Sequence, residues 1–294
     1  MSEQIWTGES WELRQGDCVE EIATLADDSI DLSVFSPPFN SLYVYSATER
    51  DLGNCSSTPE FFEHFGFVIR ELLRVIKPGR LVCCHVAQVP AMLSRDGYIG
   101  LKDFRGQCIV AFEKDGWIYH GEVCIDKDPQ AQAVRTKSKS LLFVQMRKDS
   151  SWSRPALADY ILLFRKPGDN AKAITHVESG AELTNNEWIE WARPIWYGIR
   201  ESDTLQVAEA RTEQDERHIA PLQLGTIERC LRLWSNPGEL ILSPFAGIGS
   251  EGYEAIRLGR RFIGFELKAS YARLAATNLA TASTLRQQQS LFSA

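Results

Sequence analysis

Apolar and polar positions follow one another in blocks that predict buried strands and amphipathic helices. Residues 29–36, SIDLSVFS, form an apolar, β-branched run that ends at two prolines, as a buried parallel strand does. After a polar loop, Thr58 is a good N-cap and Pro59 suits the first helical position. The apolar positions that then share one helical face are Phe61, Phe65, Val68, Leu72 and Ile76. Residues 77–79, KPG, end this helix, and residues 80–87 predict the next strand of a β-α-β unit.

The rest of the chain predicts the same kind of architecture. Residues 116–127 and 159–168 read as two further strands, whereas residues 169–216 lose clear periodicity. The last third predicts a helix over 220–235, a strand over 239–245, a glycine loop, a helix to about Leu258, a strand over 261–267 and a helix from about Ala269. We therefore expect an α/β, Rossmann-like fold with a mostly parallel sheet and helices on both faces.

Composition excludes several classes of protein. The 294 residues suffice for one large domain, and no apolar run approaches the roughly 20 residues that a membrane helix needs. The seven scattered cysteines include no C-x-x-C pair, so neither a zinc site nor a disulfide framework is predicted. The first residues lack a basic, apolar signal pattern, and we expect a cytoplasmic protein.

Charge is unevenly distributed although the net charge is −7. Basic residues dominate 127–172, and acidic residues dominate 173–216. Each stretch is either a solvated surface or, for the basic one, a face that binds phosphates. The tryptophans of the acidic stretch, Trp188, Trp191 and Trp196, form either a small local core or an exposed recognition surface.

The segment around GIGSEG predicts a nucleotide-type binding site. Gly247 and Gly249 let the backbone turn out of a strand and approach a ligand, and Glu266 ends the next strand, where a carboxylate can bind both hydroxyls of a ribose. With Gly252 the loop formally matches a dinucleotide pattern. The stiff, apolar residues 243–246 favour an adenosine and a sulfonium over two phosphates.

Two motifs together resemble a known family. SPPF at 36–39 and SPFAGIGSEG at 243–252, followed by RRFIGFEL, are similar to DNA amino-methyltransferases that use S-adenosyl-L-methionine, in the permuted (beta-type) order with the catalytic motif first. The resemblance covers most of the chain and implies a Rossmann-like methyltransferase fold. It also implies a division into a catalytic half at 1–168, a target-recognition region at 169–216 and a cofactor-binding half at 217–294, with the two halves forming one domain.

The resemblance implies specific site residues. The cofactor would be bound by Asp17, His218, Pro221, Ser243, Phe245, Ala246, Gly247, Ile248, Gly249 and Glu266. Asp17 would lie near the adenine amino group, Glu266 would hold the ribose hydroxyls, and His218 and Pro221 would lie against the methionine end. Ser243 departs from the family, which commonly has Asp at this position. No metal is implied.

The catalytic motif suits an amine that must be oriented before it reacts. The Ser36 hydroxyl and the Pro37 carbonyl can accept hydrogen bonds from an exocyclic amine, because Pro37 and Pro38 fix the backbone and carry no N–H. Phe39 can stack on a base flipped out of the duplex, which returns roughly 1–3 kcal/mol. The alternative is that the two prolines only end a strand and Phe39 belongs to the core.

The resemblance makes duplex DNA the partner and leaves a homodimer and a cognate restriction enzyme open. Family members with Ser at the first position act mostly on the 4-amino group of cytosine, which we expect here, with the 6-amino group of adenine as the alternative. Residues 127–172 would flank the catalytic cleft, with Arg135, Lys137, Lys139 and Arg154 contacting phosphates. A nucleotide-dependent oxidoreductase and a DNA-binding protein without catalysis are more distant readings.

Overall fold

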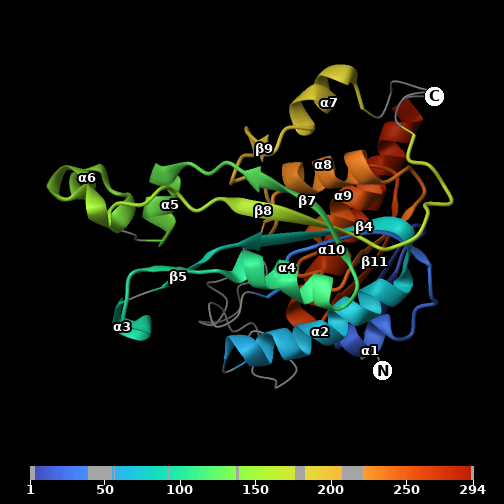
Figure 1. Cartoon of the computed structure of the whole chain (residues 1–294). Helices are drawn as coiled ribbons and strands as arrows, with labels where there is room; N and C mark the ends of the chain where they lie inside the picture. The colour runs from blue at the N-terminus through green and yellow to red at the C-terminus, as the bar shows by residue number, and fades with distance from the viewer. Residues whose placement is uncertain are drawn as a thin grey trace.

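The computed structural model describes residues 4–38, 55, 57–91, 93–136, 139–175, 183–206 and 221–292. These residues form a nine-stranded sheet of order β1-β2-β11-β10-β3-β4-β8-β7-β9, with helices on both faces (Figure 1). Its strands are β1 (Gln4–Thr7), β2 (Trp11–Gln15), β3 (Ile30–Phe35), β4 (Ile76–Ala87), β7 (Ile118–Ile125), β8 (Asp159–Arg165), β9 (Ile195–Trp196), β10 (Leu240–Ser243) and β11 (Arg261–Glu266). A second sheet pairs β5 (Val89–Ala91) with β6 (Gly100–Lys102).

The helices form two layers. They are α1 (Cys18–Ile22), α2 (Thr58–Val75), α3 (Leu93–Asp96), α4 (Phe104–Lys114), α5 (Pro129–Thr136), α6 (Phe143–Lys148), α7 (Asn185–Trp191), α8 (Leu224–Trp234), α9 (Ser250–Arg257) and α10 (Ala269–Phe292). Helices α1, α2 and α4 share one apolar core, and α8, α9 and α10 share the other. In the described part of the chain, no helix has both the length and the apolar character needed to cross a membrane.

Five adjacent strands of the sheet are parallel: β2, β11, β10, β3 and β4. Their ends are therefore aligned, with Gln15 opposite Glu266 and Phe35 opposite Cys84. We call the side where these strands end the carboxyl edge and the side where they begin the amino edge. The predicted α/β fold with a mostly parallel sheet is confirmed, although β8 and β1 run antiparallel to their neighbours.

The predicted β-α-β unit is present with shifted boundaries. The apolar stripe of α2 is fully buried, as its periodicity predicted, but Ile76, the last position assigned to that stripe, is the first residue of β4. Ser57, and not Thr58, is the N-cap, because its side chain accepts the Glu60 N–H. At the other end, residues 77–79 belong to β4 and not to a separate stop. They lie where the pairing of β3 and β4 shifts register between Ile30 and Leu32, so the strand begins directly after the helix.

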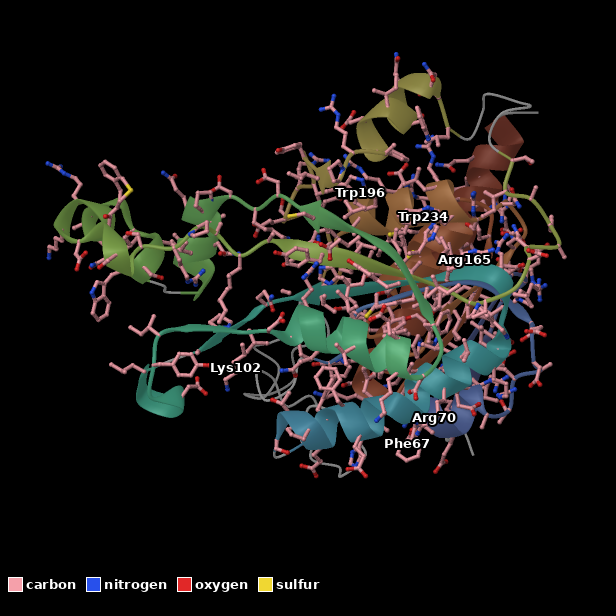
Figure 2. All side chains as sticks on the ribbon, in the orientation of Figure 1. Phe67, Arg70, Lys102, Arg165, Trp196 and Trp234 are labelled. Atoms are coloured by element: carbon pink, nitrogen blue, oxygen red, sulfur yellow. The ribbon has the colours of Figure 1, made fainter. Side chains whose placement is uncertain are left out.

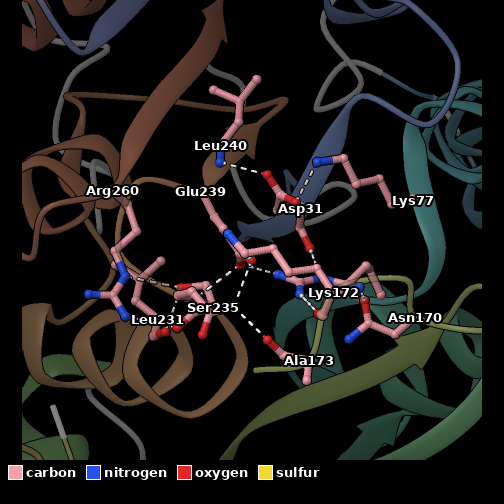
Figure 3. Close-up of polar contacts among 12 residues, drawn as sticks. Asp31, Lys77, Asn170, Lys172, Ala173, Leu231, Ser235, Glu239, Leu240 and Arg260 are labelled. Atoms are coloured by element: carbon pink, nitrogen blue, oxygen red, sulfur yellow. Dashed lines mark hydrogen bonds and ion pairs between the residues drawn. The ribbon is translucent and has the colours of Figure 1, made fainter. Parts of the chain in front are cut away.

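Buried charges at the amino edge are bonded to one another (Figure 3). The fully buried Arg80 pairs with Glu239, and its Nε donates to the Asp31 carbonyl. The Asp31 carboxylate in turn accepts from Lys77 Nζ at 2.6 Å and from the Leu240 N–H at 2.9 Å. These bonds fix β3, β4 and β10 relative to one another at the point where they begin.

Two extensions leave the sheet at its carboxyl edge. Between β7 and β8 the chain forms α5, η2 (Lys139–Leu141), α6 and η3 (Ser150–Trp152), which lie well away from the sheet (Figure 1). We call residues 129–152 the β7–β8 arm. After β4 the chain continues into β5, α3 and β6, which extend to the same side. The sequence patterns predicted neither extension.

The described part of residues 169–216 is anchored on the body of the protein. Trp196 is fully buried and stacks on Trp234 of α8, with ring centroids 6.2 Å apart (Figure 2). Trp191 is also buried, whereas Trp188 is half exposed to solvent. Two of the three tryptophans are therefore local core, and the third is available to a partner.

Candidate active site

The glycine loop connects β10 to α9 at the carboxyl edge. Gly247 and Gly249 have φ angles of 53° and 86°, which glycine adopts without strain. The loop is fixed from both sides, because the Ala246 N–H donates to the Phe265 carbonyl at 2.8 Å and the Gly249 N–H to the Ala246 carbonyl at 2.7 Å. A Cβ on Gly249 would lie 3.2 Å from the Ala275 Cβ, so α10 packs tightly there. The predicted turn out of the strand is present.

Glu266 lies beside this loop at the end of β11. Its carboxylate accepts the Gly247 N–H at 2.9 Å and the Lys268 N–H at 2.8 Å, one on each oxygen. A carboxylate oxygen can accept more than one hydrogen bond. Asp17 follows the neighbouring strand β2 and caps α1 by accepting the Val19 N–H at 2.9 Å. Sheet register therefore brings the two predicted carboxylates, 249 residues apart in the chain, to adjacent strand ends.

Polar groups around the loop are buried without protein partners. Within the described residues, the hydroxyls of Ser243 and Ser250 are buried and make no hydrogen bond. Glu251, at the start of α9, is also buried, and this burial raises the pKa of its carboxyl to about 8, with a further contribution from the charge of Glu266. Unsatisfied buried groups are costly in a finished core and are expected where a ligand completes the site.

This donor set fits S-adenosyl-L-methionine. Glu266 and Asp17 are the carboxylates that would hold the ribose and the adenine, and the two glycines leave the backbone of the loop without side chains toward a ligand. Ser243 contributes a neutral hydroxyl where the family commonly has a carboxylate. The residues predicted from sequence around the loop are thus brought together, and Glu251 is an acidic neighbour that sequence reasoning missed.

The loop meets the catalytic motif through aromatic contacts. The Phe245 ring lies 5.7 Å from that of Phe35, the last residue of β3, and 6.4 Å from that of Phe65 on α2. Ser36, Pro37 and Pro38 follow Phe35 directly. Because β3 and β10 are parallel neighbours, the two motifs end side by side at the carboxyl edge.

The Ser36 hydroxyl contacts His85 of the neighbouring strand β4. Its Oγ lies 3.1 Å from His85 Nδ1 and 3.3 Å from the His85 carbonyl oxygen. His85 Nε2 in turn lies 3.2 Å from Asp159, the first residue of β8. Sequence reasoning missed this contact. A lone polar residue inside the apolar run LVCCHVA was the available signal, and only the register of β3 on β4 places it beside Ser36.

The basic stretch 127–172 divides between the two edges, which corrects the expectation of one face. Lys127 is buried against Asp159, 2.7 Å from its carboxylate, and does not face solvent. Lys166, beyond the far end of β8, pairs with Asp28 near the amino edge. The division follows from β8, which runs antiparallel to β4 and carries the chain from one edge to the other.

The predicted phosphate-binding residues fall on or next to the β7–β8 arm. Arg135 lies in α5 and Lys139 in η2, and Arg154 follows η3, with its side chain half-buried. Pro221 lies in the stretch leading to α8. Phe39, His218 and Lys137 lie outside the described residues. The described residues contain no cluster of His, Cys, Asp or Glu arranged to hold a metal ion.

A glycine loop with an acid at the next strand end, beside a Ser-Pro-Pro edge, defines an S-adenosylmethionine-dependent methyltransferase of amino groups. The family model for DNA methylases matches residues 30–277, and the chain belongs to this family. YubD of Escherichia coli strain K12 is 31% identical over 274 residues, covering 93% of this chain and 92% of YubD. The type II methyltransferase M1.MboII of Moraxella bovis is 23% identical over 276 residues, covering 90% and 94% of the two chains.

Solved structures share the fold along the whole chain. TTHA0409 of Thermus thermophilus, in complex with S-adenosyl-L-methionine, has a TM-score of 0.67 and 24% identity, covering 92% of this chain and 95% of that one. The cytosine-N4-specific PvuII DNA methyltransferase has the same TM-score of 0.67 at 16% identity, covering 98% and 96%. The chain is therefore a DNA methyltransferase acting on exocyclic amines, its cofactor is S-adenosyl-L-methionine, and the oxidoreductase reading is set aside.

Proposed function

We propose that this enzyme methylates the 4-amino group of a cytosine that has left the DNA duplex. The supporting observation is Ser36, a neutral hydroxyl acceptor at the carboxyl end of β3, held by His85 at 3.1 Å. In the family that the chain resembles, members with Ser at this position act mostly on cytosine, and Asp or Asn usually accompanies adenine. An adenine 6-amino group is the second candidate, because the DNA adenine methyltransferase YhdJ of Escherichia coli is 35% identical over 71 residues.

The residues of the chain orient the amine and hold the cofactor. Bound S-adenosyl-L-methionine supplies the methyl group on a positively charged sulfur. Glu266 and Asp17 hold the adenosine, and the backbone of residues 246–249 encloses the methionine side. Ser36 Oγ and the Pro37 carbonyl accept the amine hydrogens, which directs the nitrogen lone pair toward the methyl group. Phe39 stacks on the face of the flipped base.

DNA is held by the β7–β8 arm and by residues 169–216. The arm exposes apolar and aromatic side chains beside basic ones, including Phe143 and Trp152 with exposed fractions of 66% and 55%. Arg147 and Lys148 are exposed at its tip, and Arg135, Lys137, Lys139 and Arg154 complete the phosphate contacts. Trp188 on α7 is the exposed aromatic of the target-recognition region. A homodimer and a cognate restriction enzyme stay predictions.

The modified base identifies the function directly. Methylation-free plasmid DNA is incubated with the enzyme and S-adenosyl-L-methionine, digested to nucleosides and analysed by mass spectrometry. We expect N4-methylcytosine, and N6-methyladenine alone would contradict the cytosine assignment.

The variants Arg147→Gln and Lys148→Gln together should weaken DNA binding and reduce its dependence on salt by about two charges. Unchanged salt dependence would remove the arm from the DNA interface.

A further inference from the structure

A row of four polar side chains crosses the carboxyl edge behind the amine site. Ser36, His85, Asp159 and Lys127 come from or directly follow β3, β4, β8 and β7, which are consecutive strands of the sheet. The successive distances are 3.1 Å from Ser36 Oγ to His85 Nδ1, 3.2 Å from His85 Nε2 to Asp159 Oδ2, and 2.7 Å from Asp159 Oδ2 to Lys127 Nζ. The row is continuous at hydrogen-bond or ion-pair distance.

Three of these four residues are shielded from solvent. His85, Asp159 and Lys127 have exposed fractions of 7%, 9% and 5%. Burial alone raises the pKa of the Asp159 carboxyl, but the neighbouring His85 and Lys127 outweigh it and lower the pKa to about 2. Asp159 is therefore a carboxylate at neutral pH. A buried ion pair of this kind is seldom retained for stability alone, because desolvation offsets most of its attraction.

The Asp159 carboxylate selects one form of the imidazole. A carboxylate only accepts hydrogen bonds, so it favours the tautomer with the proton on His85 Nε2. Nδ1 is then a lone-pair acceptor 3.1 Å from Ser36 Oγ, and the Ser36 hydroxyl can donate either to it or to the His85 carbonyl, 3.3 Å away. Ser36 Oγ in this state keeps its lone pairs for the hydrogens of the target amine. The row thus influences in which direction the Ser36 hydroxyl donates its hydrogen bond, as well as where the hydroxyl lies.

We propose that His85, oriented by Asp159, is a positioning residue that takes up, through the Ser36 hydroxyl, the proton released by the methylated amine. This deepens the proposed function and applies to cytosine and adenine alike. As the N–C bond forms, the C–S bond breaks and its electron pair stays on sulfur. The nitrogen, now cationic, gives one proton to Ser36 Oγ, and the Ser36 hydroxyl proton passes to His85 Nδ1. The imidazolium formed next to Asp159 later loses its proton to water.

Lys127 balances the charge of the row. With Asp159 it forms a neutral pair, so the pair orients the imidazole without adding a net negative charge beside it. Other charges packed nearby are engaged elsewhere: Arg105 of α4, the helix that covers β4, binds Glu122 of β7. Among the described residues, the ion pairs of the row are those of Asp159 with His85 and with Lys127. The titratable side chains of Tyr160 and Cys124 also lie within electrostatic range of Asp159.

The test replaces His85 by a residue that accepts a hydrogen bond but cannot take up a proton. The His85→Asn side chain places an amide oxygen near the position of Nδ1. We expect its single-turnover methylation rate to fall about 100-fold at neutral pH. We also expect the acidic limb of the wild-type pH–rate profile to disappear, because a protonated imidazole cannot accept the amine proton. Tyr160→Phe, a hydroxyl deletion next to Asp159, is the matched control and should keep both rate and profile.

Folding is checked by melting temperature and by S-adenosyl-L-methionine affinity, both of which should match the wild type. The paired variant Asp159→Asn/Lys127→Met removes both charges together and keeps the test open if His85→Asn folds poorly. It should lower the rate similarly and add little to His85→Asn, since the residues act as one unit. A His85→Asn enzyme with a wild-type rate, or with the acidic limb retained, overturns the relay. If the wild type methylates adenine and His85→Asn loses the acidic limb of the pH–rate profile, the relay is supported and only the choice of base is overturned.

Discussion

The two edges of the parallel sheet both bury polar groups, but they treat them differently. At the amino edge, Arg80, Glu239 and Asp31 are bonded to one another and to backbone groups (Figure 3). At the carboxyl edge, the hydroxyls of Ser243 and Ser250 are buried without a protein partner among the described residues. The hydrogen bonds of the amino edge are complete in the folded protein, whereas the proposed cofactor and substrate would complete those of the carboxyl edge. The two edges therefore differ in whether their buried polar groups have hydrogen-bond partners within the protein, and not in whether they bury polar groups.

The largest effect is expected from breaking the amino edge. Arg80→Met leaves the buried Glu239 carboxylate without its cation, so the free energy of unfolding should fall by about 3–5 kcal/mol. Urea unfolding measures the change. The fraction that remains folded should bind S-adenosyl-L-methionine as the wild type does, and a selective loss of cofactor binding would show that the two edges are coupled.

The pH dependence of stability should be set in part by the carboxyl edge. The pKa of the Glu251 carboxyl is about 8 in the folded protein and has an ordinary value of 4.5, so the folded state binds the proton more tightly. The unfolded state therefore loses its proton first, and the free energy of unfolding falls as pH rises from about 4.5 to about 8. Over that range Glu251→Gln should gain a few kcal/mol relative to the wild type. Parallel unfolding curves for the two proteins at low and high pH would contradict this.

Ser36→Ala should separate catalysis from folding. Loss of one oriented acceptor is expected to reduce the methylation rate about 100-fold, or roughly 2.7 kcal/mol in the barrier. The half-buried hydroxyl contributes little to stability, so the melting temperature should stay close to that of the wild type. Single-turnover assays and thermal melts on the same preparation provide the comparison, and a coupled loss of both would make Ser36 a structural residue.

Two glycines with similar backbones offer the finest comparison. Gly249 in the loop and Gly238 near the amino edge have φ angles of 86° and 78°. An alanine at either position carries the strain of a left-handed residue, about 1–2 kcal/mol. A Cβ on Gly249 also meets Ala275 at 3.2 Å, whereas one on Gly238 meets nothing within 4 Å. Of the two variants, only Gly249→Ala should weaken S-adenosyl-L-methionine binding, by about tenfold. If Gly249→Ala and Gly238→Ala bind the cofactor with equal affinity, the loop is not part of the cofactor site.

Sequence reasoning succeeded where local pattern and strand register agree. The apolar run of β3, the amphipathic face of α2 and the loop before α9 each depend on neighbouring residues, so their periodicity predicted them. The assignment of Glu266 and Asp17 to one cofactor site followed from the family resemblance. It is consistent with the alignment of β11 with β2, which places both residues at adjacent strand ends.

Features that depend on contacts distant in the chain were not predicted. His85 reads as one polar residue in a buried strand, and its contact with Asp159 spans 74 residues of sequence. Much of the apolar surface of the β7–β8 arm is exposed and does not pack on the sheet. Its sequence therefore lacks the periodic apolar stripe by which a buried helix is predicted. The acidic stretch at 173–216 was ambiguous for a similar reason: Glu187 is used to bind Arg232 of α8, which composition cannot reveal.

The strand order has a consequence for how the protein is made. β10 and β11 follow all other strands in chain order among the described residues, yet they lie in the middle of the sheet, between β2 and β3. A ribosome that has released the residues up to β9 has therefore delivered two outer parts of the sheet without the strands that join them. We expect the nascent chain to stay open, with apolar strand surfaces exposed, until its last quarter emerges. We therefore expect synthesis of this enzyme to depend on chaperones more than that of a protein whose central strands are translated first.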